Sequence, residues 1–176
     1  MASAVRILGI DPGSVRTGYG IVDSDGRSSR HVTHGCIAGS GDTLPERLGT
    51  IYRGVAAIIA EYGPVEMGVE EVFLAHNPKA ALKLGQARGA AICAGVECGL
   101  TVAEYSARSI KQNIVGTGGA AKEQVQHMVN ALLSLNGEPI QADAADALAV
   151  ALCHAHARTR PLAAAPARRR KSVRWK

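Results

Sequence analysis

The stretch VRILGIDPGSVRTGYGIVD, residues 5–23, decides the fold class. It contains an apolar run from Val5 to Ile10, then Asp11 with a Pro-Gly pair, and then a second apolar run from Thr17 to Asp23. Adjacent Pro and Gly mark a tight turn, so the pattern predicts two strands joined as a hairpin. A third, weaker strand is expected over Ser29–Ala38, which would complete an antiparallel meander.

Helical and extended patterns alternate in the rest of the chain. Two further strands are predicted, over Met67–Phe73 and Thr101–Tyr105. The predicted helices run from the Thr43 cap to Gly63, from Lys79 to about Glu97, from the Ser106 cap to about Val115, from Lys122 to Leu135 and from about Asp143 to Ala157. This order indicates an α/β fold with a mixed sheet that is covered by helices on both faces.

The chain has 176 residues, of which 47% are hydrophobic and 20% are charged, and its formal net charge is +5. This length and composition indicate one folded domain. Residues 158–176 contain eight Lys or Arg and no acid, which leaves 12 of the 20 basic residues against 15 acidic ones, a charge of −3. We therefore expect a single domain over residues 1–157 and a basic, flexible tail over 158–176 that adds salt-sensitive affinity for phosphates.

Targeting signals and cysteine chemistry are not indicated. No apolar run approaches the ~18 residues that cross a bilayer, and the opening MASAVRILGID lacks the layout of a signal peptide, so we expect a cytoplasmic protein. The four cysteines form no Cys-x-x-Cys pair. We expect them to be reduced and mostly buried, without disulfides or zinc.

Carboxylates stand in three segments where a strand ends or a helix begins. Asp11 follows an apolar strand, and Glu70 and Glu71 lie inside another predicted strand. Strand alternation sends Glu70 and Glu71 to opposite faces, so at most one of them shares a site with Asp11. Asp143 and Asp146 are three positions apart, which places both on one face of a helix.

Each of these acids has a structural explanation when it is taken alone. Asp is favoured in turns, and acids in the first turn of a helix interact favourably with the helix dipole. Together, however, they provide the hard oxygen ligands that Mg²⁺ selects. Since two such ions can flank a scissile phosphate, the combination favours a site that cleaves phosphodiester bonds.

Two lysines and one aromatic residue are candidates for contact with nucleic acid. Lys111 and Lys122 flank the glycine-rich loop GTGGA, where a backbone and a lysine can both approach a phosphate. Solvated surface lysines are the alternative. Phe73 is the single phenylalanine of the chain; it is either a core residue or, if exposed, a ring that stacks on bases.

Other polar residues are weaker candidates. Ser106 stands where a helix cap belongs and has no nucleophile motif around it. His154 and His156 are two positions apart and project to different sides of a helix, so we expect them on the surface rather than as joint metal ligands.

Four long blocks resemble one known family. The blocks are GIDPGSVRTGYG, EEVFLAHNPKAALKLGQARG, EYSARSIKQNIVGTGGAAKEQVQHMV and QADAADALAVALCH. In this order they are similar to the RuvC Holliday-junction resolvases, over about Val5 to His156. The resemblance implies a ribonuclease H-like domain, a homodimer, and Mg²⁺-dependent cleavage of two opposed strands of a four-way DNA junction. It also implies partnership with the RuvA and RuvB branch-migration proteins.

The resemblance assigns roles to individual residues. It implies that the catalytic carboxylates hold two Mg²⁺ ions, for which Mn²⁺ substitutes, and that they are Asp11, Glu70, Asp143 and Asp146. It implies that the residues in contact with DNA are Lys111, Lys122 and the base-stacking Phe73.

Two competing functions stay open. One is an RNA-processing nuclease of the same fold, against which the KLGQARG and QVQHMV blocks argue. The other is a non-catalytic junction-binding protein whose acids only stabilise helix ends.

Overall fold

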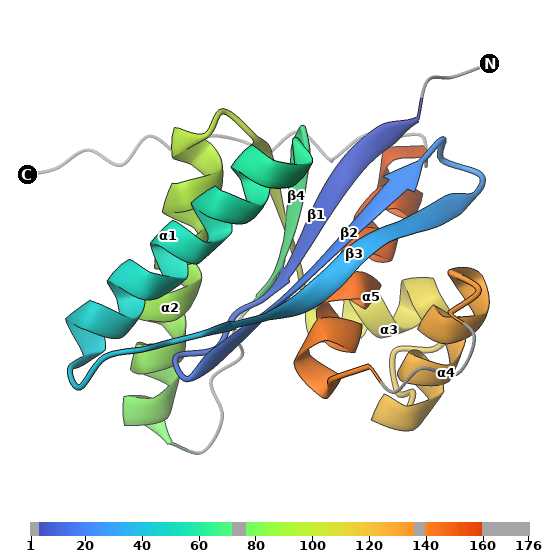
Figure 1. The fold of residues 1–176 in the computed structure, drawn as a ribbon. Coiled ribbons are helices and arrows are strands. Elements are labelled where there is room, and N and C mark those ends of the chain that lie inside the picture. Colours follow the sequence, from blue (N-terminus) through green and yellow to red (C-terminus); the bar gives the residue numbers. More distant parts are fainter. Residues whose placement is uncertain (1–3, 72–76, 136–139, 160–176) are drawn as a thin grey trace, which may run out of the picture.

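A five-stranded sheet forms the centre of the molecule (Figure 1). The computed structural model describes residues 4–71, 77–135 and 140–159. The strands are β1 (Val5–Asp11), β2 (Arg16–Ser24), β3 (Ser29–Ala38), β4 (Glu66–Glu70) and β5 (Thr101–Tyr105), and the sheet order is β3-β2-β1-β4-β5. The first three strands form the predicted antiparallel meander, and β4 and β5 run parallel to β1.

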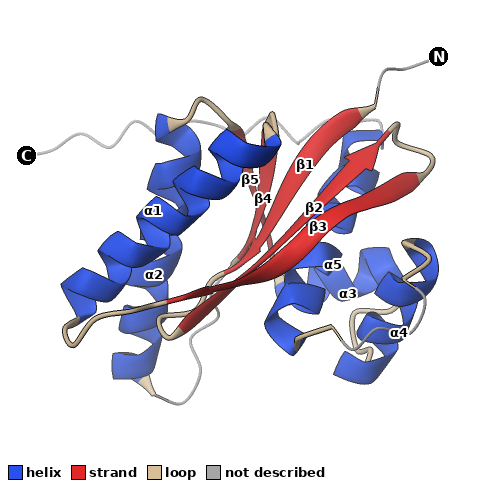
Figure 2. Cartoon of the chain, viewed as in Figure 1, coloured by secondary structure: helices blue, strands red, loops and turns tan. Residues whose placement is uncertain are grey.

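Helices cover both faces of the sheet (Figure 2). They are α1 (Leu44–Tyr62), α2 (Pro78–Glu97), α3 (Ala107–Val115), α4 (Lys122–Leu132) and α5 (Ala142–Thr159). Helices α1 and α2 pack on one face, and α5 packs on the other face with α3 and α4 beside it. The expected α/β class, a mixed sheet between two helical layers, is confirmed.

The helix ends follow local chemistry. Thr43 and Glu46 form a capping box at α1, and Ser106 accepts a hydrogen bond from the backbone of Ser109 at α3, as predicted. Helix α4 is shorter than predicted and ends at Leu132, because the chain turns soon after it. Helix α5 is longer and continues to Thr159, beyond the expected end of the domain.

Glycines let α5 lie directly on the sheet. A Cβ atom on Gly18 would be 2.0 Å from the carbonyl oxygen of Asp143, and one on Gly9 would be 2.1 Å from that of Ala147. No side chain other than hydrogen fits at these distances. The backbone of α5 therefore contacts β1 and β2 closely, which sets how near to the sheet its first turns lie.

Two expectations about buried residues are wrong. Cys93 and Cys98 are exposed and Cys36 is half-buried, so only Cys153 among the cysteines is buried. His154 is also buried, 5% exposed, because α5 is enclosed on almost all sides.

Among the helices of the described ranges, none is long and apolar enough to span a membrane.

Candidate active site

Asp11 and Glu70 end two neighbouring parallel strands. Ile10 in β1 pairs with Val69 in β4, so the residues that follow them lie at the same edge of the sheet. After burial, the charge of Glu70 is the largest cause of the raised pKa of Asp11, so the two carboxyl groups lie close together. Glu71 is exposed. Of the two adjacent glutamates, Glu70 is therefore the neighbour of Asp11.

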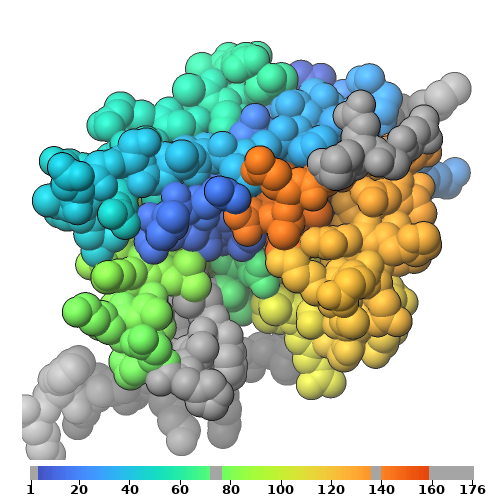
Figure 3. Space-filling model, turned by 60° about the horizontal axis from the view of Figure 1, so that its bottom comes forward, coloured from blue at the N-terminus to red at the C-terminus, as the bar shows by residue number. Residues whose placement is uncertain are grey.

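The first turns of α5 bring two more carboxylates to this edge. Asp143 and Asp146 both act electrostatically on Asp11. Because Gly18 allows the close approach of α5, Asp143 lies beside β2, where Arg16 Nε is 4.0 Å from Asp143 Oδ2. Figure 3 shows the start of α5, in orange, against the turn between β1 and β2, in blue.

Burial and mutual repulsion shift the ionisation of these groups. Burial in the first place, and then the charges of Glu70, Asp146 and Asp143, raise the pKa of Asp11 to about 8. The pKa of Glu70 is also raised, first by burial and then by Asp146. The positive charge of Lys122 acts in the opposite direction on both groups. This edge of the sheet thus holds more negative charge than its surroundings neutralise.

A pocket opens beside the carboxylates and contains both predicted lysines. Glu70 and Asp146 contribute acidic groups to its lining, and Lys111 from α3 and Lys122 from α4 contribute basic ones. The rest of the wall is small or apolar and consists of Ala107, Ile110, Val125 and Ala149. Lys122 Nζ lies 2.6 Å from Asp146 Oδ2, and this hydrogen bond is the main cause of the raised pKa of Lys122. The pocket therefore offers both signs of charge to a ligand such as a phosphate.

The donor set fits a hard divalent cation. All four candidate ligands are carboxylates, which Mg²⁺ and Mn²⁺ accept, and their negative charge is in excess. In the part of the chain that the structure describes, no three His, Cys, Asp or Glu side chains are gathered into a finished metal site. Instead Asp146 pairs with Lys122, and Asp143 faces Arg16. The acids share one electrostatic neighbourhood without forming a closed coordination shell.

One predicted residue lies outside this picture. Phe73 falls within residues 72–76, which are outside the described residues. The structure brings together the four acids and the two lysines, which come from five different elements.

Sequence reasoning missed a buried polar group that lies behind the site. His154 in α5 bonds to Glu66 at the start of β4 and to Tyr105 at the end of β5. The sequence contained a signal for this burial. Alanine and aliphatic residues occupy all sides of α5, and a helix that is apolar all round is typically buried. A histidine inside it had to be buried and paired.

Comparison with known proteins gives consistent results. Residues 7–154 match the family described as crossover junction endodeoxyribonuclease RuvC. The protein of that name from Pseudomonas putida (strain W619) is 58% identical over 166 residues, which cover 93% of this chain and 95% of that protein.

Solved structures agree with this match. T. thermophilus RuvC in complex with Holliday junction substrate superposes with a TM-score of 0.82 at 35% identity, covering 88% of this chain and 94% of that chain. The yeast mitochondrial Holliday junction resolvase Ydc2 has a TM-score of 0.61 at 14% identity, covering 86% of this chain and 79% of that chain, and shares the fold. On its sequence and its fold, this chain belongs to the RuvC family of crossover junction endodeoxyribonucleases.

Proposed function

We propose that this protein is a structure-specific endonuclease that resolves four-way DNA junctions by hydrolysing phosphodiester bonds in two opposed strands. The observation that carries the proposal is the meeting of Asp11, Glu70 and the first turns of α5 beside a pocket that contains Lys111 and Lys122. Support comes from the T. thermophilus relative, whose structure contains a Holliday junction substrate. In the reaction, a water oxygen bonds to phosphorus, one phosphorus–oxygen bond of the strand breaks, and the departing oxygen takes up a proton.

Membership of the family implies dependence on a divalent metal ion. We assign its ligands to Asp11, Glu70, Asp143 and Asp146, and we propose two Mg²⁺ ions, with Mn²⁺ as a substitute. Bound there, the ions supply Lewis acidity and neutralise charge on the attacking and leaving oxygens. The four carboxylates would hold the ions in place. Without a metal ion, their excess negative charge attracts cations and repels anions.

The lysines have a different role in this proposal. Lys111 and Lys122 reach the pocket from α3 and α4 and hold the scissile phosphate by charge-assisted hydrogen bonds. The rest of the pocket wall is small or apolar, and hydrogen bonds made beside apolar groups are stronger than those made in open water. Phe73, three residues after Glu70 in the sequence, is assigned to base stacking on the strength of the resemblance.

The setting of the reaction is also part of the proposal. We propose that the protein acts as a homodimer. A two-fold axis gives two identical active sites, one for each of the two opposed strands that are cut. We propose RuvA and RuvB as partners and the cytoplasm as location. The nuclease domain corresponds to about residues 1–157, and the basic residues after it strengthen binding to DNA at moderate salt.

A cleavage assay tests this function against its two rivals. The protein is mixed with a four-way DNA junction, a linear duplex of the same sequence and a structured RNA, each with and without Mg²⁺. We expect cleavage of the junction alone and only with the ion. Cleavage of the RNA instead would favour an RNA-processing nuclease, and tight junction binding that never leads to nicking would favour a non-catalytic binder.

A further inference from the structure

A chain of hydrogen bonds joins α5 to two strands beneath the active-site edge. His154 Nε2 lies 2.7 Å from Glu66 Oε2, and His154 Nδ1 lies 2.8 Å from the Tyr105 hydroxyl. Arg158, one helical turn further along α5, places its Nε 2.7 Å from the same Glu66 oxygen. Since the side chain of His154 is only 6% exposed, these bonds are made largely away from water.

The chemistry of these groups settles which atom donates. A carboxylate accepts hydrogen bonds, so Nε2 of His154 carries the hydrogen that Glu66 receives. In this tautomer Nδ1 carries no hydrogen and is an acceptor, and the Tyr105 hydroxyl donates to it. Burial raises the pKa of Tyr105 to about 12, which keeps this hydroxyl protonated and able to donate. Every ring nitrogen of His154 is thus satisfied with the ring in one orientation.

The same helix and the same strand carry both this network and the candidate metal ligands. Strand β4 begins at Glu66 and ends at Glu70, a span of about 13 Å at the usual rise of a strand. On α5, Asp146 and His154 are eight positions apart, a span of about 12 Å along a helix. Helix α5 runs in the opposite direction to β4 and the two spans are nearly equal. When His154 lies beside Glu66, Asp146 therefore lies beside Glu70.

Close packing between the two contact points supports this alignment. A Cβ atom on Gly68, in the middle of β4, would lie 3.1 Å from Val150 Cγ1 and 3.3 Å from His154 Cβ. The helix therefore packs closely against the middle of the strand. Alanine and glycine surfaces are smooth, and smooth surfaces allow a helix to slide, whereas a bonded polar group holds one register.

We propose that His154 is a positioning residue, whose bonds to Glu66 and Tyr105 fix the register of α5 along β4 and so hold Asp146 beside Glu70. The inference rests on the proposed function, in which Glu70 and Asp146 bind the metal. The competing explanation is a buried histidine that stabilises the fold without any effect on the metal site. The two differ in whether metal affinity depends on the network.

The test measures Mn²⁺ binding to the full-length, metal-free protein without DNA, by electron paramagnetic resonance. His154→Ala and Glu66→Ala should each raise the Mn²⁺ dissociation constant by about tenfold, as loss of a group that orients metal ligands does. The double variant should be no weaker than the weaker single variant, because both changes break the same bond. His154→Gln, which keeps an amide N–H for Glu66, should recover most of the affinity.

Val55→Ala provides the control for simple destabilisation. Val55 is fully buried between α1 and the opposite face of the sheet, so its truncation lowers stability without touching α5. Unchanged Mn²⁺ affinity in His154→Ala and Glu66→Ala, at a stability loss equal to that of Val55→Ala, would overturn the positioning role alone. Failure of the unaltered protein to bind Mn²⁺, or equal binding by Asp146→Asn, would overturn the proposed metal site and this inference with it.

Discussion

Lys122 Nζ lies 2.6 Å from Asp146 Oδ2, which ties the first residue of α4 to the second turn of α5. This hydrogen bond thus joins the start of α4, which follows the glycine-rich loop, to the part of α5 that lies at the carboxylate edge of the sheet. Because Lys122 and Asp146 both line the pocket, this pair lies beside the space where we propose that a phosphate binds.

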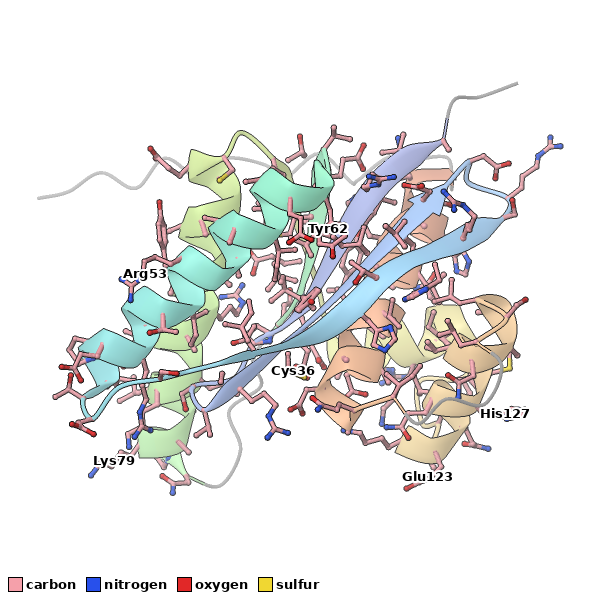
Figure 4. The ribbon with its side chains drawn as sticks, viewed as in Figure 1. Cys36, Arg53, Tyr62, Lys79, Glu123 and His127 are labelled. Atoms are coloured by element: carbon pink, nitrogen blue, oxygen red, sulfur yellow. The ribbon has the colours of Figure 1, made fainter. Side chains whose placement is uncertain are left out.

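Removal of this lysine should impair chemistry more than binding. Lys122→Ala should lower the single-turnover cleavage rate at saturating enzyme by roughly tenfold to a hundredfold, because the phosphate is held less accurately. Arg53→Ala is the control, since Arg53 points away from the sheet on the outer side of α1 and its loss removes the same charge (Figure 4). An equal loss in both variants would mean that Lys122 contributes only its charge.

Replacement of one candidate ligand by its amide should abolish cleavage and preserve junction binding. The expected fall in rate for Asp11→Asn, Glu70→Gln, Asp143→Asn or Asp146→Asn is on the order of 10³-fold, since transition-state charge loses its stabilisation. Binding should be unchanged or stronger, because repulsion of the phosphates decreases. The measurements are cleavage kinetics and gel-shift affinity with junction DNA.

Two further glutamates serve as controls for this series. Glu71 is exposed next to Glu70, and Glu123 is exposed on the outer side of α4 (Figure 4). Glu71→Gln and Glu123→Gln should retain the rate of the unaltered protein. If Glu71→Gln is as damaging as Glu70→Gln, the assignment of Glu70 is wrong.

Metal binding should increase the free energy of unfolding of the protein in the absence of DNA. At an ion concentration 100 times its dissociation constant, Mg²⁺ should raise the free energy of unfolding by about 2.7 kcal/mol. Chemical denaturation with Mg²⁺ and with a chelator measures this difference. The gain should vanish in Asp11→Asn, and its persistence there would place the ion elsewhere.

The packing of α5 on the sheet should be critical at Gly18. An added Cβ would lie 2.0 Å from the backbone of Asp143, so Gly18→Ala should push α5 outward, cost ~1–3 kcal/mol of stability and displace Asp143. Cleavage by the folded fraction should also fall. Gly49→Ala in α1 meets only the flexible guanidinium of Arg53 and should stabilise the helix by about 0.5–1 kcal/mol with no effect on cleavage.

A mixed dimer tests the arrangement of two sites. If each protomer cuts one strand, as we propose, a heterodimer of the unaltered chain with Asp11→Asn should nick one strand of a cruciform in a supercoiled plasmid and leave the opposed strand intact. The ratio of nicked to linear plasmid distinguishes the outcomes. Complete resolution by a purified heterodimer would contradict the mechanism in which each protomer makes one cut.

The local structure of this protein was readable from its sequence. Alternating apolar runs around Asp11 predicted the meander, and the capping residues Thr43 and Ser106 predicted where two helices begin. Turns and helix caps depend on residues only a few positions apart in the sequence. These residues are also close together in the folded protein, so the sequence pattern is enough to predict them. Patterns also singled out the acidic residues and the two lysines as candidates, but they did not show that these groups lie together.

Only the tertiary structure decided which distant groups lie together. Asp11 and Asp146 are more than 100 positions apart, and they approach because glycines in β1 and β2 allow α5 to contact the sheet. The parallel register of β1 and β4 placed Glu70 beside Asp11, which strand alternation alone left open. His154, expected on the surface, is buried because α5 crosses the sheet and is covered by α3 and α4. Sequence periodicity reports which side of an element is apolar, whereas strand order and the closeness of packing depend on contacts between segments that no local pattern contains.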